Sequence, residues 1–288
     1  MRAEAEAQPD IQELLLPGAR LELQFDPAFG PAVRAAAVQW VRTAAEAVAG
    51  WLGRFPVPEL ELLLLPSDHA GIASGTAFFD PAPWVRLRMG LATDGAALRD
   101  DWVLVHELLH LALPQLPRHQ RWFHEGVATY AESLVRARAG LLAPQALWGG
   151  FAAQMPQGQP AAGDQGLDRT DTWGRVYWGG AMFCLLADVQ MRRRSQGRQG
   201  LRDALAGVLA AGGDYRQAWP LARVLAVADA AVGQRTLTEL HAMAAACPMP
   251  VDLAALWADL GVQPLPGGGC RLHSAAPLAA LRESLTAA

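Results

Sequence analysis

Residues 101–113 form an apolar segment that also carries two histidines and a glutamate. The segment is Asp-Trp-Val-Leu-Val-His-Glu-Leu-Leu-His-Leu-Ala-Leu, and it predicts a helix that ends before Pro114. A helix this apolar has to be buried, and buried imidazoles and carboxylates are costly unless something satisfies them. The fold must therefore bury this helix and also supply a partner for its polar groups.

The polar residues of this helix, His106-Glu107-Leu108-Leu109-His110, have the spacing of a metal site. Residues four apart lie on one face of a helix, so both imidazoles can bind one ion. Glu107 projects beside that ion, where it can act as general base toward a metal-bound water. Zn²⁺ is the expected cofactor, because two neutral imidazoles and a carboxylate suit it. The three scattered cysteines form neither a metal-ligand spacing nor a disulfide framework.

A catalytic zinc ion usually has three protein ligands and one open position, so one ligand must come from elsewhere. The segment after residue 121 offers Glu125 as the preferred ligand and His124 as its rival, and only one can face the metal because neighbours on a helix point about 100° apart. If it is not a ligand, His124 is expected to be a polar residue near the cleft rim. Glu132, two turns on, is either a hydrogen-bond acceptor for a ligand histidine or an ordinary surface glutamate.

The N-terminal part of the chain, to about residue 92, predicts a small α+β lobe. Alternating and continuous apolar patterns predict its strands, and helical spacing that starts at a proline predicts one helix. These expected elements are strands at 21–25, 60–65 and 84–89 and a helix at 31–52.

One edge of this sheet is the expected substrate site. Either the stretch from Gly75 to Phe79 or the strand at Trp84 should lie at the edge, where an extended peptide can pair as an extra strand. The candidate substrate-binding residues are therefore Gly75, Thr76 and Ala77.

The remainder, 93–288, predicts a mainly helical lobe that carries the zinc site and forms one catalytic unit with residues 1–92. Asp94 is a plausible cap, and residues 149–172 lack periodicity and predict a loop. The expected helices are 101–113, 122–139, 174–195, 201–211, 214–232 and 237–246, followed by short helices broken at 264–269. The fold class is thus α+β with two lobes, a mixed sheet lobe followed by a helical lobe, and zinc in the cleft between them.

Two segments resemble a known family. HELLH followed by WFHEGVATYAESLVRARAGL is similar to the gluzincin zinc metallopeptidases, most closely the glycyl aminopeptidase family, and so is the segment from Tyr177 to Phe183 with the later Asp188, Arg192 and residues 199–203. The resemblance implies a thermolysin-like, two-lobed fold with zinc on His106, His110 and Glu125, and Glu107 as base. It further implies that Tyr177 supports the oxyanion of the tetrahedral intermediate; the alternative is a core aromatic residue at an interface.

The expected function is zinc-dependent hydrolysis of peptide bonds in a peptide or protein substrate. One alternative is a peptidase-like module that binds zinc without turnover, although Glu107 and Tyr177 are both present. The other is a structural helical protein with a fortuitous motif. In other aminopeptidases a Gly-x-Met-Glu-Asn segment supplies a glutamate that binds the free amine of the substrate, and this chain has no such segment. The fourteen residues between His110 and Glu125 are also fewer than is usual for the family that the chain resembles. An aminopeptidase and an endopeptidase therefore both stay open.

Composition excludes some classes of partner. A net charge of −4 gives no reason to expect nucleic acid or an anionic membrane, and no apolar run reaches the roughly 18 residues that span a bilayer. The N-terminus has no hydrophobic signal core, so the protein is cytoplasmic as written, or periplasmic or secreted if a leader was removed.

Overall fold

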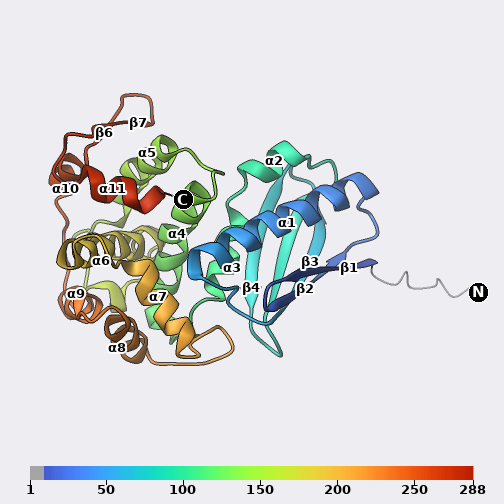
Figure 1. Cartoon of the computed structure of the whole chain (residues 1–288), viewed down its shortest axis with the longest axis horizontal. Coiled ribbons are helices and arrows are strands. Elements are labelled where there is room, and N and C mark those ends of the chain that lie inside the picture. The colour runs from blue at the N-terminus through green and yellow to red at the C-terminus, as the bar shows by residue number, and fades with distance from the viewer. Residues whose placement is uncertain (1–9, 288) are drawn as a thin grey trace, which may run out of the picture.

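The computed structural model describes residues 10–287 and has two lobes side by side, a sheet lobe and a helical lobe (Figure 1). The predicted α+β class and the order of the lobes are confirmed. The last strand of the sheet ends at Gly90 and the next helix begins at Gly95, on either side of the predicted boundary at residue 92. The sequence predicted no signal core at the N-terminus. Residues 1–9 of that stretch lie outside the described residues.

The sheet of the first lobe has five strands in the order β1-β2-β3-β5-β4. The outer pairs, β1 with β2 and β4 with β5, are antiparallel, whereas β2 with β3 and β3 with β5 are parallel. Of the two predicted edge segments, the one at residue 75 is the edge strand, and the strand at Trp84 lies inside the sheet. The strands are β1 (Asp10–Leu16), β2 (Ala19–Phe25), β3 (Glu59–Ser67), β4 (Ile72–Phe78) and β5 (Trp84–Gly90).

Helix α1 (Pro31–Leu52) crosses one face of this sheet (Figure 1). It has the predicted bounds, because Pro31 suits the first turn and Gly53 takes the left-handed conformation that ends a helix. The alternating apolar residues Leu21, Leu23 and Phe25 are at most 1% exposed. Alternation therefore predicted correctly which residues of β2 are buried.

After β5 the chain is mainly helical. Helix α2 (Gly95–Asp100) lies beside α1 on the sheet lobe (Figure 1). The later helices are α3 (Val103–His110), α4 (Arg121–Arg138), α5 (Pro144–Gln154), α6 (Gly180–Ser195), α7 (Leu201–Ala210), α8 (Leu221–Ala231), α9 (Thr236–Ala244), α10 (Leu253–Leu260) and α11 (Ala279–Thr286). Shorter elements are the 3₁₀ turns η1 (Arg118–Gln120), η2 (Met155–Gly158) and η3 (Leu167–Arg169), the π-helical turn η4 (Arg175–Gly179), and a hairpin of β6 (Val262–Pro264) and β7 (Cys270–Leu272). Asp94 caps α2, as predicted.

Two predicted segments are wrong in part. The loop expected from residue 149 is helical to Gln154, because the buried face of α5, which includes Trp148 and Phe151, outweighs two glycines. The helix expected from residue 214 begins only at Leu221, immediately after Pro220. Strand β1 and the β6–β7 hairpin were not predicted.

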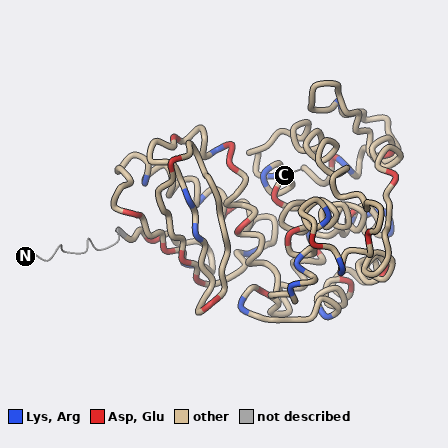
Figure 2. Tube along the Cα trace, turned by 180° about the vertical axis from the view of Figure 1, so that it is seen from behind, with Lys and Arg blue, Asp and Glu red and all other residues tan. Residues whose placement is uncertain are grey.

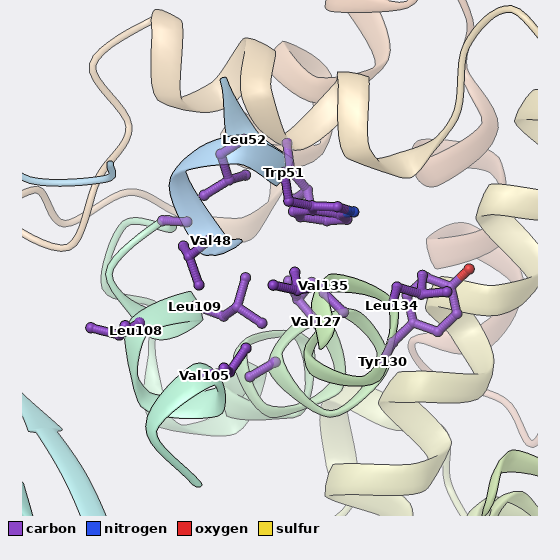
Figure 3. Close-up of a cluster of buried hydrophobic side chains, with 14 of the residues drawn as sticks. Val48, Trp51, Leu52, Val105, Leu108, Leu109, Val127, Tyr130, Leu134 and Val135 are labelled. Atoms are coloured by element: carbon purple, nitrogen blue, oxygen red, sulfur yellow. The ribbon is translucent and has the colours of Figure 1, made fainter. Parts of the chain in front are cut away.

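A buried apolar cluster holds α1, α3 and α4 together behind the cleft (Figure 3). It fixes α3 on the side away from its histidines, since apolar and polar residues divide between the two faces of this helix. The labelled members are Val48, Trp51 and Leu52 of α1, Val105, Leu108 and Leu109 of α3, and Val127, Tyr130, Leu134 and Val135 of α4.

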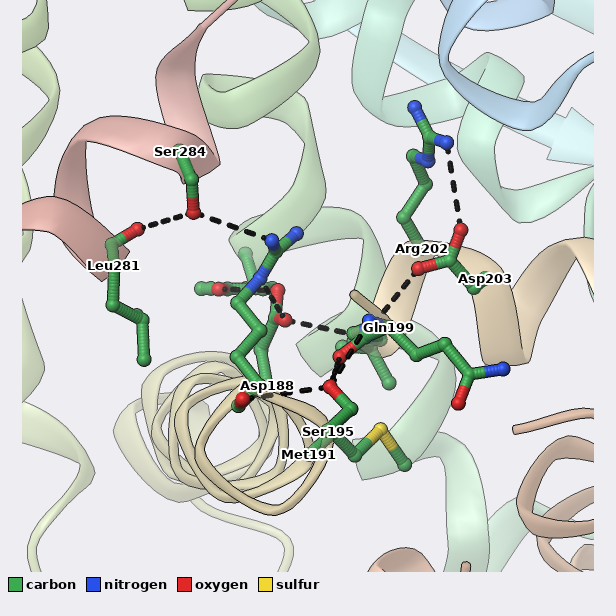
Figure 4. A network of polar contacts seen from close by, with 12 residues as sticks. Asp188, Met191, Ser195, Gln199, Arg202, Asp203, Leu281 and Ser284 are labelled. Carbon is green, nitrogen blue, oxygen red and sulfur yellow. Dashed lines mark hydrogen bonds and ion pairs between the residues drawn. The ribbon is translucent and has the colours of Figure 1, made fainter. Parts of the chain in front are cut away.

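A polar network joins the helices that follow (Figure 4). The buried carboxylate of Asp188 accepts hydrogen bonds from the Tyr130 hydroxyl, from Arg192 Nε and from the Leu201 amide at 2.8–3.1 Å. Arg192 also donates to Ser284 of α11. A buried carboxylate needs such donors. Asp188 and Arg192, both in the second segment that carries the family resemblance, therefore connect α4, α6, α7 and α11.

Charged residues of both signs occur on both lobes (Figure 2). None of the helices between residues 10 and 287 combines the length and apolar character needed to cross a membrane.

Candidate metal centre

Helices α3 and α4 bring three potential metal ligands together. Glu125 Oε2 lies 3.3 Å from His106 Nε2 and 3.5 Å from His110 Nε2, and the three ligand atoms lie within 4.8 Å of one another. Two ligands about 2.0–2.1 Å from one tetrahedral ion are roughly 3.3–3.4 Å apart, so this spacing suits zinc. Two imidazoles and one carboxylate also have the donor chemistry that Zn²⁺ prefers.

Burial and mutual contact set the charges of this cluster. Burial lowers the pKa of His106. Burial also acts against charge on His110 and Glu125, but their contact overcomes it, so the pKa of His110 is raised and that of Glu125 is lowered. Glu125 is consequently ionised at neutral pH, which a carboxylate ligand requires.

His124 lies behind this cluster instead of inside it. It is buried, with 9% of its surface exposed, and it lines the cleft cavity. Its Nε2 lies 2.9 Å from the Pro114 carbonyl, which can only accept a hydrogen bond, so Nε2 must donate. Burial lowers the pKa of His124 to about 4, so the ring is neutral and its Nδ1 is an acceptor.

This hydrogen bond also determines the tautomer of His110. His110 Nδ1 lies 3.0 Å from His124 Nδ1 and must be the donor in that pair. The lone pair of His110 is then on Nε2, the nitrogen that faces Glu125. Fixing the tautomer of a ligand histidine in this way orients it for a metal ion. The sequence motif gave no sign of this contact.

The proposed base, Glu107, lies between the metal cluster and the edge strand. The amide of Ala77 donates a hydrogen bond of 2.8 Å to Glu107 Oε2. A Cβ at Gly75 would lie 2.7 Å from both Glu107 Cγ and Val103 Cγ1, so only glycine lets β4 approach α3 this closely. The predicted substrate residues on β4 thus lie against the predicted base.

Tyr177 approaches from the π-helical turn η4. Its ring stacks on His106 at 6.3 Å between centroids and on Trp173 at 5.5 Å. Burial, together with the charge of Glu125, raises the pKa of Tyr177 to about 12, so the phenol keeps its proton. π-Helical turns occur often at functional sites, and this one turns the Tyr177 ring toward the cluster.

Two glycines allow η4 to come so near. A Cβ at Gly126 would lie 2.4 Å from the Gly180 carbonyl carbon, and a Cβ at Gly180 would lie 2.3 Å from the Trp122 carbonyl oxygen. Helix α4 and the start of α6 therefore pack backbone against backbone, one residue after Glu125. This close packing sets the distance between Tyr177 and the metal cluster.

Tyr215 completes the cleft and was not predicted. Its hydroxyl lies 3.4 Å from the Ala77 carbonyl oxygen, its ring packs on His124, and its amide donates to the Leu111 carbonyl. The sequence placed Tyr215 in a helix, whereas it lies in the loop before α8. Its rarity, as one of three tyrosines, was the only available signal.

A cavity of about 490 Å³ contains most of the predicted site. It is lined by Gly75, Thr76, Ala77, His106, Glu107, His110, Glu125 and Tyr177, along with Tyr215 and others. Glu132 lies outside it. Its carboxylate accepts a hydrogen bond from Ser133, and within the described part of the chain no hydrogen bond joins it to a ligand histidine. A supporting role for Glu132 at the metal stays a prediction.

Comparison with known proteins identifies the fold. No family model and no curated protein matches the chain. Among solved structures, an aminopeptidase N family protein from Idiomarina loihiensis matches with a TM-score of 0.61 at 13% identity, covering 88% of this chain and 49% of that one. A variant M1 zinc metallopeptidase from Deinococcus radiodurans bound to a Tyr-Ser-Ala substrate matches with a TM-score of 0.53 at 15% identity, covering 85% and 53%. The chain thus spans about half the length of these proteins, and it has the two-lobed fold of the M1 zinc metallopeptidases.

Proposed function

We propose that the protein is a zinc-dependent metallopeptidase that hydrolyses peptide bonds. The proposal depends above all on the cluster of His106, His110 and Glu125, which has the donor set and spacing of a zinc site. The fold shared with zinc metallopeptidases supports it, and so does the peptide substrate of the Deinococcus radiodurans protein. Net charge and the mixture of charge signs in Figure 2 give no support to a nucleic-acid partner.

A zinc ion held by these three residues would supply Lewis acidity, which polarises a scissile carbonyl and acidifies an attacking water. Glu107 is the base that takes the water proton and then gives it to the leaving amine. The Tyr177 hydroxyl, protonated because its pKa is about 12, donates a hydrogen bond to the oxygen on which charge develops.

The edge strand β4 is the proposed binding site for the substrate backbone. The amide and carbonyl of Ala77 face Glu107 and Tyr215, not the neighbouring strand, so both point into the cleft. An extended peptide that replaces these two contacts can pair with β4 and lie across Glu107. Gly75, Thr76 and Ala77 are the proposed contacts.

Metal analysis and a peptide-library digest test the proposal. The purified protein should contain about one zinc per chain, and His106→Ala should abolish it, whereas His119→Ala, at an exposed histidine outside the cluster, should not. Glu107→Gln should keep zinc and fold but lose hydrolysis. Zinc without hydrolysis in the wild type would instead indicate an inactive zinc-binding module, and retention of zinc by His106→Ala would remove the assigned site. The cleavage sites in the digest distinguish an aminopeptidase from an endopeptidase.

A further inference from the structure

A second cavity, of about 550 Å³, adjoins the cleft beside Glu107. We call it the tryptophan cavity, because Trp102, Trp173 and Trp178 line it. Four residues line both this cavity and the cleft, namely Gly75, His106, Glu107 and Tyr177. The proposed mechanism gives the tryptophan cavity no role, although it opens next to the metal cluster.

The exposed aromatic side chains of the protein gather at these two cavities. Among residues 10–287, all Phe, Tyr and Trp side chains are buried or half-buried except three. Phe79, which is 47% exposed, lines the cleft, whereas Trp102 and Trp173, which are 51% and 57% exposed, line the tryptophan cavity. Exposed apolar surface that gathers at one place typically marks a binding site. We therefore looked for a ligand that covers the two indoles.

Both exposed indoles are held against rings of the metal site. The Trp173 ring stacks on Tyr177 at 5.5 Å between centroids, and the Trp102 ring meets the His106 ring edge to face at 5.6 Å. Tyr177 in turn stacks on His106. These are the arrangements that aromatic pairs prefer, and a further ring in the cavity can contact the indoles in the same way.

The polar residues of the lining have little surface to offer a ligand. His106, Glu107, Thr129 and Arg136 are each at most 8% exposed, and the side chain of Glu132 is 13% exposed. The buried guanidinium of Arg136 already contacts the Glu132 carboxylate at 3.5 Å and donates to the Asp100 carbonyl. The open side-chain surface of the tryptophan cavity is therefore mainly that of the two exposed indoles.

A peptide on the edge strand β4 would pass both cavities. Residues 73–75 of this strand line the tryptophan cavity, and residues 75–77 line the cleft. Side chains alternate along an extended chain, so a peptide paired with β4 can project one side chain toward the tryptophan cavity while its backbone lies across Glu107. The occupant of this cavity is then a side chain of the substrate itself.

We propose that the tryptophan cavity is a specificity site for an aromatic side chain, that of Phe, Tyr or Trp, in the peptide substrate. An aromatic ring buries more apolar surface there than a small side chain, and it adds ring contacts with Trp102 and Trp173 that an aliphatic chain cannot make. A basic side chain would be opposed by the charge of Arg136, and an acidic one by that of Glu107. The proposal rests on the proposed peptidase function and names its substrate class.

The test measures binding, so that it does not depend on turnover. Zinc-loaded Glu107→Gln protein is titrated with alanine pentapeptides, with free and with acetylated N-termini, that carry Phe, Leu, Arg or Glu at each position in turn. At one position Phe should bind at least about tenfold more tightly than Ala, because its ring is buried, and several-fold more tightly than Leu. Equal binding of Phe and Leu at every position, or a stronger preference for Arg or Glu, would overturn the proposal.

Matched substitutions locate the site of this preference. Trp102→Ala and Trp173→Ala each remove one indole wall, and each should lower the ratio of Phe to Ala peptide affinity several-fold. The ratio is the readout because a displaced His106 or Tyr177 would weaken both peptides alike. Met243→Ala is the control, since it removes a side chain of α9 that is 60% exposed and lines neither cavity, and it should leave the ratio unchanged.

The outcomes separate this proposal from the proposed function. A ratio that Trp102→Ala and Trp173→Ala both leave intact would refute the assignment of the tryptophan cavity. Selective binding of aromatic peptides by a protein whose wild type hydrolyses no peptide would refute only the peptidase function. Hydrolysis by the wild type without any aromatic preference would refute only the specificity site.

Discussion

Replacing Gly126 with alanine tests how packing positions the catalytic groups. The added Cβ would lie 2.4–2.8 Å from three backbone atoms of Gly180, whereas ordinary contacts begin at about 3.4 Å. Backbone cannot rotate aside as a side chain can, so α4 and the start of α6 must separate by about 1 Å.

The size of the effect follows from this separation. Overpacking costs up to about 3 kcal/mol, and the gain in helix propensity from glycine to alanine offsets about 1 kcal/mol of it. A net loss of about 2 kcal/mol should lower Tm by roughly 4–8 °C in a protein of this size. Because Tyr177 lies three residues before Gly180, it should move with η4, and a shift of about 1 Å can reduce kcat by about 100-fold.

Calorimetry, zinc analysis and peptide hydrolysis below the lower Tm measure these effects. Gly150→Ala is the matched control, because a Cβ at this exposed position in α5 would meet nothing within 4 Å. It should leave kcat unchanged and raise stability slightly. An unchanged Tm together with an unchanged kcat for Gly126→Ala would show that the close packing does not position Tyr177.

Three further substitutions test single groups of the site. Tyr177→Phe should lower kcat by roughly 10²–10³ at nearly constant KM and zinc content, and a change in KM alone would contradict an oxyanion role. His124→Phe removes the acceptor for His110 Nδ1 and should weaken zinc binding by about 10–100-fold in a chelator competition; equal affinity would exclude the tautomer argument. Gly75→Ala should displace Glu107, because its Cβ would lie 2.7 Å from Glu107 Cγ, and should reduce kcat without loss of zinc; wild-type kcat would count against this.

Features within one helix could be predicted from the sequence, because helical geometry fixes their relative positions. His106 and His110 lie on one face of α3, and the apolar residues between them lie on the other. Alternation likewise indicated the buried face of β2. The bounds of α1 followed from a proline and a glycine with defined backbone preferences.

Contacts between distant segments could not be predicted in the same way. Tyr215 reaches the cleft because its loop pairs with the segment after α3, through the bridge of Gln115 to Ala218 and the bond from its amide to the Leu111 carbonyl. Neither contact has a sequence signature. The edge position of β4 also depended on pairing, since β5 has the more regular alternation and yet lies inside the sheet.

Three consecutive residues of α4 show why the segment around Glu125 is so restricted. His124 faces His110, Glu125 faces the metal cluster, and Gly126 faces Gly180, because successive side chains turn by about 100°. Each position therefore meets a different requirement: a hydrogen-bond acceptor that sets a tautomer, a negative charge, and the absence of a side chain. A substitution of His124 should change zinc affinity through His110. A substitution of Glu125 should weaken zinc binding through the lost charge, and one of Gly126 should change the distance between Tyr177 and the metal cluster. Measuring zinc affinity and kcat separately for the three positions distinguishes these effects, because only the change at Gly126 acts through the spacing of helices.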